Sequence, residues 1–245
     1  VTVWVTNGVN HFDITPAAGL TAGGVGIWTG CTLNGLPVLN NGINPPFWWN
    51  GETGEVCQPL PDWPLNTTAK SIRAYKYHLI ALNITQNSIE IPNMVMWSDS
   101  ADPNSVPGSW TPLPSNDAGD SLLAEELGGL VDAEPLRDQL VIYRQHSTAL
   151  CNYVAGQYVF SFRELFNTSG IQALNCAAEV RGKHYVITDD DIIVHDGNQF
   201  KSICDNVIRF YVFRAINPDN QYMCCIAART SADEVWFNFP RVDGT

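Results

Sequence analysis

Charged residues are scarce in this chain. Only 16% of its 245 residues are charged, and 13 basic side chains face 25 acidic ones, for a net charge of −12. Ordinary globular chains are roughly 25% charged. With so few basic residues the chain cannot bind a phosphate backbone through a general basic surface. The composition therefore excludes a non-specific nucleic-acid-binding protein. The 8 Trp, 8 Tyr and 10 Phe exclude a disordered tail or a coiled coil.

Long apolar runs are also missing. No stretch approaches the roughly 18 apolar residues that a membrane-spanning helix needs, and the N-terminus has no basic region followed by an apolar one. We therefore expect a soluble chain with no membrane-spanning segment. The sequence begins at Val1, inside an expected strand, and ends abruptly at Thr245. We interpret it as a piece of a longer polypeptide.

The seven cysteines lack CxxC or CxxxC spacing. Their number is odd, which disfavours both metal clusters and a regular disulfide framework. Cys224 and Cys225 are adjacent in an expected strand, where successive side chains point to opposite faces, so they are poorly placed to chelate one ion. We predict buried free thiols and a reducing site of synthesis, such as a cytoplasm. The other five are Cys31, Cys57, Cys151, Cys176 and Cys204.

Helical periodicity is nearly absent. The apolar residues form short runs of four to seven that are broken by Gly, Pro, Asn and Asp, which predicts an all-β fold. The one helix-like stretch is Ser121–Leu127, with Asp120 or Ser121 as its N-cap and Gly128-Gly129 as its end. We expect two turns at most, decorating a loop.

The strand pattern repeats from about residue 70 onward. Each repeat contains a hydrophobic strand as its second strand, and a further strand follows it. These second strands start 61, 44 and 39 residues apart along the chain. A period near 40–45 residues with about four strands per unit is typical of a β-propeller, whose blades bury their faces against one another. We predict at least four blades with long loop insertions. The second strands are His78–Leu82, Gln139–Tyr143, Lys183–Ile187 and Tyr222–Ile226, and the following strands are Met94–Trp97, Tyr158–Phe162, Asp191–Val194 and Glu234–Phe237.

Residues 1–65 follow the same pattern less regularly. Val1–Val5 and His11–Ile14 predict a hairpin across Asn7-Gly8, and Leu36–Leu39 and Pro46–Asn50 supply further short strands. We therefore divide the chain into N-terminal β-hairpins with a partial blade, residues 1–65, and propeller blades, residues 66–245.

An acidic cluster is the most conspicuous polar feature, formed by Asp189, Asp190, Asp191 and Asp196. Calcium takes six to eight oxygens, but the apolar residues that directly follow Asp191 do not match an EF-hand loop. Asp residues are common where strands reverse. We assign the cluster to turns and predict no metal site.

Catalytic motifs are missing too. Glycoside hydrolysis requires a pair of carboxylates that face a sugar pocket. The candidates are Glu125, Glu126, Asp132 and Glu134, but nothing in the sequence sets the distance between them. The histidines are dispersed, and no nucleophile elbow or phosphate loop occurs. We predict no catalytic residue, no cofactor-binding residue and no cofactor. The histidines are His11, His78, His146, His184 and His195.

The aromatic residues allow two interpretations. They either stack on sugars or a partner subunit, or they fill the space between blades. The candidates are Phe47, Trp48, Trp49, Trp97, Trp110 and Trp236, with Trp48, Trp49 and Trp110 the ones expected to stack on sugar. Three sequons, at Asn66, Asn83 and Asn167, match the glycosylation pattern, but Asn and Thr are abundant enough for chance matches.

Several segments that combine a strand with a turn occur in a characteristic order along the chain. In sequence these segments resemble the propeller region of the tail nozzle family, also called tail tubular protein B, of short-tailed bacteriophages. The resemblance covers roughly residues 36–240 and rests on ordered segments rather than on one invariant motif. The segments are Ala69–Asn83, Val95–Asp99, Pro107–Trp110, Pro135–Tyr143, Tyr153–Arg163, Gly170 and Gly182–Gly197.

The resemblance implies a structural virion protein rather than an enzyme. It implies a homohexameric ring in the phage tail, below the portal and adaptor proteins and near the tail needle or fibre proteins, assembled in the host bacterial cytoplasm. DNA would pass through its channel without specific binding, and an acidic lumen would repel the phosphates. Two alternatives stay open: a carbohydrate-binding or glycoside-hydrolysing propeller, and a scaffold propeller that binds other proteins.

Overall fold

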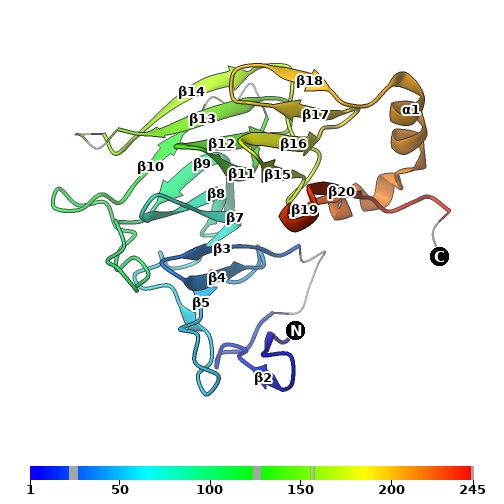
Figure 1. Cartoon of the computed structure of the whole chain (residues 1–245). Coiled ribbons are helices and arrows are strands. Elements are labelled where there is room, and N and C mark those ends of the chain that lie inside the picture. Colours follow the sequence, from blue (N-terminus) through cyan, green and yellow to red (C-terminus); the bar gives the residue numbers. More distant parts are fainter. Residues whose placement is uncertain (22–26, 124–127, 155, 157, 244–245) are drawn as a thin grey trace. The chain divides into compact units, whose positions relative to one another are not determined.

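The computed structural model describes residues 1–21, 27–123, 128–154, 156 and 158–243 (Figure 1). The chain divides into two compact units, Val1–Leu123 (unit 1) and Ala124–Thr245 (unit 2). Strands account for 45% of the residues, and the strands pair in antiparallel sheets, several of them four-stranded. The predicted all-β fold is confirmed.

Unit 1 contains one hairpin and two four-stranded sheets. The hairpin crosses Asn7-Gly8 as predicted, and the expected sequence division after residue 65 falls between the two larger sheets. The hairpin consists of β1 (Trp4–Thr6) and β2 (His11–Asp13). The first sheet runs β3 (Thr29–Leu33), β4 (Leu36–Asn40), β5 (Phe47–Trp48), β6 (Gln58–Pro59), and the second runs β7 (Thr67–Tyr75), β8 (His78–Gln86), β9 (Ile89–Trp97), β10 (Gly119–Leu122).

Unit 2 repeats this arrangement. Its two four-stranded sheets are also formed by consecutive strands, and a two-stranded sheet follows them. The first sheet runs β11 (Leu130–Leu136), β12 (Gln139–Arg144), β13 (Thr148–Tyr153), β14 (Phe160–Phe166). The second runs β15 (Ala177–Val180), β16 (Lys183–Ile187), β17 (Ile192–His195), β18 (Phe200–Ser202), and the last pair is β19 (Cys225–Arg229) and β20 (Glu234–Asn238).

Tight turns set the register of these sheets. The two-residue turns between β3 and β4, β8 and β9, and β15 and β16 each place two residues at positive φ, as a type I′ hairpin requires. Asn34-Gly35 has φ values of 52° and 83°, a conformation that suits both residue types. Each of these turns reverses the chain, and in all four four-stranded sheets the strands that follow one another in sequence are neighbours, so each of these sheets is a meander.

Helical segments in unit 2 correct the sequence prediction. An α-helix, α1 (Asn206–Ala215), follows Asp205, whose side chain accepts hydrogen bonds from the N–H groups of Val207 and Ile208. The Asp N-cap and a stretch free of Gly and Pro were available signals. A 3₁₀ segment, η2 (Pro218–Met223), occupies the start of the expected strand Tyr222–Ile226, and the strand begins only at Cys225. A single 3₁₀ turn, η3 (Thr230–Ala232), separates β19 from β20.

The predicted helix near residue 121 is also wrong in its described part. Asp120 and Ser121 belong to β10 and pair with Met96 and Val95 of β9, so neither is a helix cap. Residues 124–127 lie outside the described residues.

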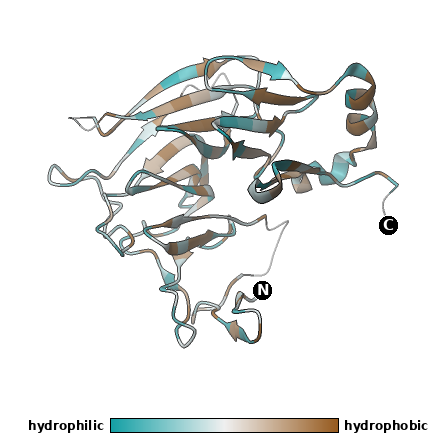
Figure 2. Cartoon of the chain, viewed as in Figure 1, coloured by the Kyte–Doolittle hydropathy of each residue, from teal (hydrophilic) through white to brown (hydrophobic). Residues whose placement is uncertain are grey.

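Each unit has its own apolar core. In unit 1 one cluster gathers β3, β4, β7, β8 and β9 around Trp110, and a smaller one surrounds Trp49. In unit 2 the core joins β11, β12 and β13 to β15, β16 and β17. Brown, apolar segments run along the strands of Figure 2. Among the described residues, no helix combines the length and the apolar character required to cross a membrane.

Candidate functional site

A buried polar network joins the two larger sheets of unit 2. Tyr143 of β12 places its Oη 2.7 Å from His184 Nδ1 of β16 and 2.7 Å from His195 Nε2 of β17. The three residues are 1%, 0% and 2% exposed. Adjacent sheets are thus joined by hydrogen bonds inside an otherwise apolar core.

The proton positions in this network follow from its ends. His184 Nε2 lies 2.9 Å from the Pro135 carbonyl oxygen, which can only accept, so Nε2 carries the proton and Nδ1 accepts from Tyr143. Tyr143 then accepts from His195 Nε2, and His195 Nδ1 accepts from the Gly197 N–H at 3.3 Å. Every ring nitrogen has a partner with both imidazoles neutral.

Burial holds the network in this neutral state. Burial lowers the pKa of His184 to about 4, and burial with the nearby His184 lowers the pKa of His195 to about 3. Burial also raises the pKa of Tyr143 well above 10, with a further increase from the Glu134 and Asp132 carboxylates. A general base works best with a pKa near the operating pH and within reach of its substrate. The network meets neither condition, so it positions the sheets.

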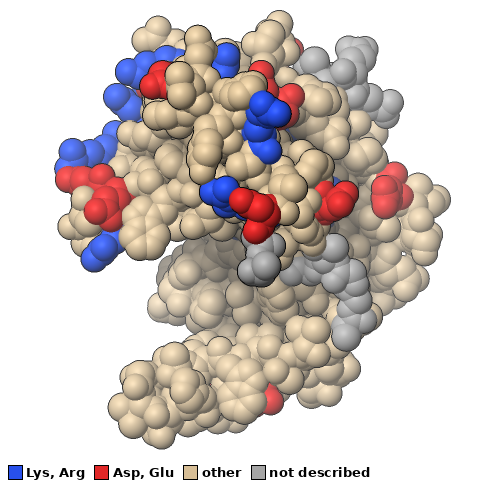
Figure 3. Space-filling view, turned by 90° about the vertical axis from the view of Figure 1, so that its right-hand side faces the viewer, with Lys and Arg blue, Asp and Glu red and all other residues tan. Residues whose placement is uncertain are grey.

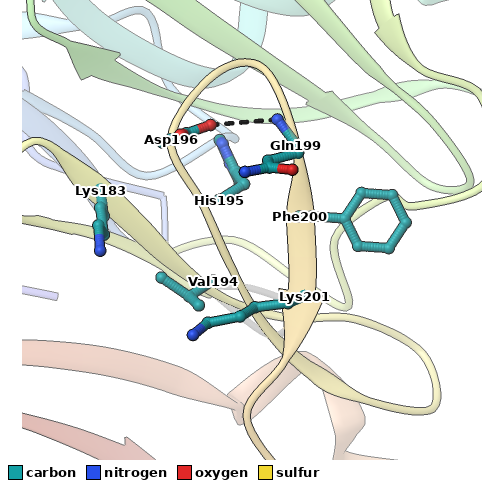
Figure 4. Close-up of a pocket in the computed structure, with 7 residues that line it drawn as sticks. All are labelled: Lys183, Val194, His195, Asp196, Gln199, Phe200 and Lys201. Carbon is teal, nitrogen blue, oxygen red and sulfur yellow. Dashed lines mark hydrogen bonds between the residues drawn. The ribbon is translucent and has the colours of Figure 1, made fainter.

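A hollow of about 250 Å³ opens beside His195 (Figure 4). The Asp196 carboxylate is not free to act on a molecule in this hollow. It accepts hydrogen bonds from the N–H groups of Asn198 and Gln199 at 2.9 and 3.1 Å and so closes the β17–β18 turn. These hydrogen bonds lower the pKa of Asp196. Among the described residues, Asp196 is the one carboxylate that lines the hollow, so the described lining contains no carboxylate pair. The lining residues are Lys183, Val194, His195, Asp196, Gln199, Phe200 and Lys201.

The structure splits the predicted acidic cluster between two turns. Asp189 and Asp190 are exposed between β16 and β17, where the Thr188 hydroxyl accepts from the N–H groups of Asp190 and Asp191. Asp191 accepts from the Ser202 hydroxyl at 3.0 Å. Asp196 lies at the other end of β17. The four carboxylates thus lie in turns, and within the described ranges no three His, Cys, Asp or Glu residues are grouped to hold a metal ion.

The candidate glycosidase carboxylates do not form a described pair. Asp132 is 3% exposed and accepts from the Asn175 N–H at 2.8 Å, so it holds the chain before β15 against β11. Glu134 is two residues further along the same strand. Glu125 and Glu126 lie outside the described residues.

The three tryptophans expected to stack on sugar are dispersed over two clusters of unit 1, and the candidate Trp236 lies in β20 of unit 2, where it is 53% exposed. Trp110 is 2% exposed and packs edge-on against Trp63, with ring centroids 4.6 Å apart. Trp48 packs against the same cluster. Trp49 belongs to the other cluster, and its Nε1 donates to the carbonyls of Glu52 and Glu55. Trp49 and Trp110 fill the cores, and no common stacking platform results.

All seven cysteines are free thiols, as predicted. Cys57, Cys151, Cys176 and Cys224 are buried, and the other three are half-buried. Burial raises the pKa of Cys151 to about 12 and of Cys57 to about 11. These thiols are protonated at neutral pH and act as small core residues.

Two features were missed by sequence reasoning. The facing histidines could have been derived, because the β16–β17 register places His184 opposite His195. Tyr143 comes from a different sheet and carried no signal. The second feature is the exposed apolar surface of α1, in which seven of ten residues are Val, Ile, Phe, Tyr or Ala and none is buried.

No protein-family model matches the chain, and no curated protein matches it.

Proposed function

We propose that this chain is a structural virion component of the tail nozzle type, whose four-stranded sheets are the blades of a β-propeller. One observation carries the proposal: four successive groups of strands each form a four-stranded meander, β3–β6, β7–β10, β11–β14 and β15–β18. A sheet built from four consecutive strands and repeated along the chain is typical of propeller blades. The same order underlies the resemblance to the nozzle family.

The polar chemistry supports a structural role. The conspicuous buried groups are used for packing: Tyr143, His184 and His195 satisfy one another, and Asp132 binds a backbone N–H. A glycosidase needs two free carboxylates across a sugar pocket, and a lectin needs exposed aromatic faces. The candidates for both tasks, as far as the structure describes them, serve turns, strands or cores.

The nozzle proposal includes self-assembly into a hexameric ring that docks on portal and adaptor proteins and conducts DNA. An acidic lumen accords with the net charge of −12, because like charge lets DNA slide past. Basic and acidic side chains lie side by side in the upper part of the view in Figure 3, so the charges drawn there form no uniformly acidic surface.

Electron microscopy of the purified chain and of the native particle tests the proposal. We expect six-fold rings that bind portal–adaptor complexes, and density for the chain at the end of the tail. A glycan array tests the alternative that the chain binds carbohydrate. Binding or cleavage of an oligosaccharide by a chain that forms no ring would overturn the proposal.

A further inference from the structure

Helix α1 has a strongly apolar surface that unit 2 does not bury. None of its ten residues is buried, although seven of them are Val, Ile, Phe, Tyr or Ala (Figure 2). Val207 is 77% exposed, Phe210 62% and Tyr211 58%. A contiguous exposed apolar surface of this kind is typical of an interaction site, whereas single exposed apolar residues are not.

Two faces of α1 can be distinguished. Val212 and Phe213 pack against the core of unit 2, and this side attaches the helix to its own sheet. Val207, Phe210, Tyr211 and Arg214 have the i, i+3, i+4, i+7 spacing of one helix face. We call these four residues the outer face of α1. On the outer face the Tyr211 hydroxyl accepts a hydrogen bond from Arg241 at 2.9 Å, yet Tyr211 stays 58% exposed, so the face remains open to a partner.

The size of this face fits a protein interface. An aromatic side chain can bury about 150–250 Å², so Phe210 and Tyr211 at their exposed fractions offer roughly 200–300 Å². Val207 and the neighbouring Ile208, which is 51% exposed, enlarge it. One partner in a standard interface contributes about 800 Å², of which somewhat more than half is apolar. The helix alone supplies a large share of that apolar area.

The charge beside the face indicates the nature of the partner. The Arg214 guanidinium stacks on the Phe210 ring at 4.8 Å, and within the described part of the chain no carboxylate pairs with it. A complementary surface is therefore apolar with acidic groups at its rim. A second copy of this chain, with 25 acidic and 13 basic residues, has an excess of such groups.

We infer that the outer face of α1 docks on a different surface of a second copy of this chain. The inference rests on the proposed function, since it assigns one of the contacts that build the ring. A contact between two unlike surfaces is the type that closes into rings. Phe210 and Tyr211 are its apolar anchors and Arg214 its polar rim.

The test compares assembly of three proteins by sedimentation velocity over a range of concentrations. The double variant Val207→Ser/Phe210→Ser removes two apolar side chains of the outer face, one of them the anchor Phe210. The matched control is Leu65→Ser/Ile89→Ser, from unit 1 residues that are 88% and 67% exposed. We expect the double variant to need at least about tenfold more protein for half-assembly and the control to stay within about twofold of wild type. Since α1 buries no residue, the double variant should keep its near-UV circular dichroism.

The outcomes separate the two proposals. A double variant that assembles like wild type overturns the docking of α1 and leaves the nozzle proposal standing. Wild-type protein that stays monomeric at every concentration overturns both. Hydrogen exchange of the α1 amides gives a second measurement: slowing on self-assembly supports the inference, and slowing only after portal–adaptor complex is added overturns it.

Discussion

Unit 1 and unit 2 each contain two four-stranded meanders, but the side chains inside them differ. Unit 1 holds seven of the eight Trp and three of the 13 basic residues, whereas unit 2 holds one Trp, ten basic residues and eight of the ten Phe. In unit 1, Trp49, Trp97 and Trp110 are buried, whereas the sheets of unit 2 are joined by Tyr143, His184 and His195. The same sheet architecture therefore accommodates buried indole rings in one unit and a neutral polar network in the other.

Removal of Trp110 should have the largest effect and should be confined to unit 1. Trp110→Ala leaves a cavity beside Trp63 in a core where Trp110 is 2% exposed. We expect a loss of about 3–5 kcal/mol in the free energy of unfolding. Urea unfolding followed by Trp fluorescence reports mainly on unit 1. Trp4→Ala, at a site 57% exposed, is the control and should change stability by less than about 0.5 kcal/mol.

Mild acid should destabilise unit 2 more than unit 1. Both histidines of the network titrate near pH 6.5 when unfolded, whereas burial lowers the pKa of His184 to about 4 and of His195 to about 3. Between these values the unfolded state binds more protons, so the stabilisation is complete above pH 6.5 and is lost as pH falls toward 4. From pH 7 to pH 5 we expect a loss of up to about 3–4 kcal/mol.

Urea titrations at several pH values, followed by far-UV circular dichroism and by Trp fluorescence, check this difference. His184→Gln removes one titrating group and should roughly halve the pH slope of the unit 2 transition. Unit 1 has one histidine in its core, His78, whose Nδ1 lies 2.9 Å from the Ser98 carbonyl oxygen. Equal slopes for the two units would mean that the network does not control the acid response.

The strands were predictable where their signal is local. Gln139–Tyr143 and Lys183–Ile187 are short apolar runs between turn residues, and both are strands. Helix α1 was missed because its apolar residues surround the axis, so no amphipathic period identifies it. The Tyr143 network was missed because its members lie 41 and 52 positions apart and meet only when two sheets pack. Long-range packing is not encoded in the spacing of one segment.

Gly170 shows how closely unit 2 packs. A Cβ at this position would lie 2.3 Å from the Gln145 carbonyl oxygen and 2.5 Å from that of Arg144, both backbone atoms that cannot rotate away. Gly170→Ala should therefore cost about 3 kcal/mol, seen in the unit 2 transition by circular dichroism. Gly108→Ala, where nothing lies within 4 Å, is the matched control from unit 1. Similar small effects for both would refute the close backbone approach.

The smallest effect is expected at the exposed ion pair between Arg181 and Asp233, whose side chains are 74% and 57% exposed. Exposed pairs contribute about 0–1 kcal/mol because water and salt screen them. Asp233 has a φ of 56°, a conformation that Asn also tolerates, so Asp233→Asn removes the charge without backbone strain. We expect a change below about 0.5 kcal/mol that disappears in 0.5 M salt. Asp132→Asn, at a buried carboxylate that accepts a backbone N–H, should cost about 1–3 kcal/mol in the same titration. If the two substitutions lowered the free energy of unfolding equally, the buried Asp132 would contribute no more to the stability of unit 2 than the exposed Asp233.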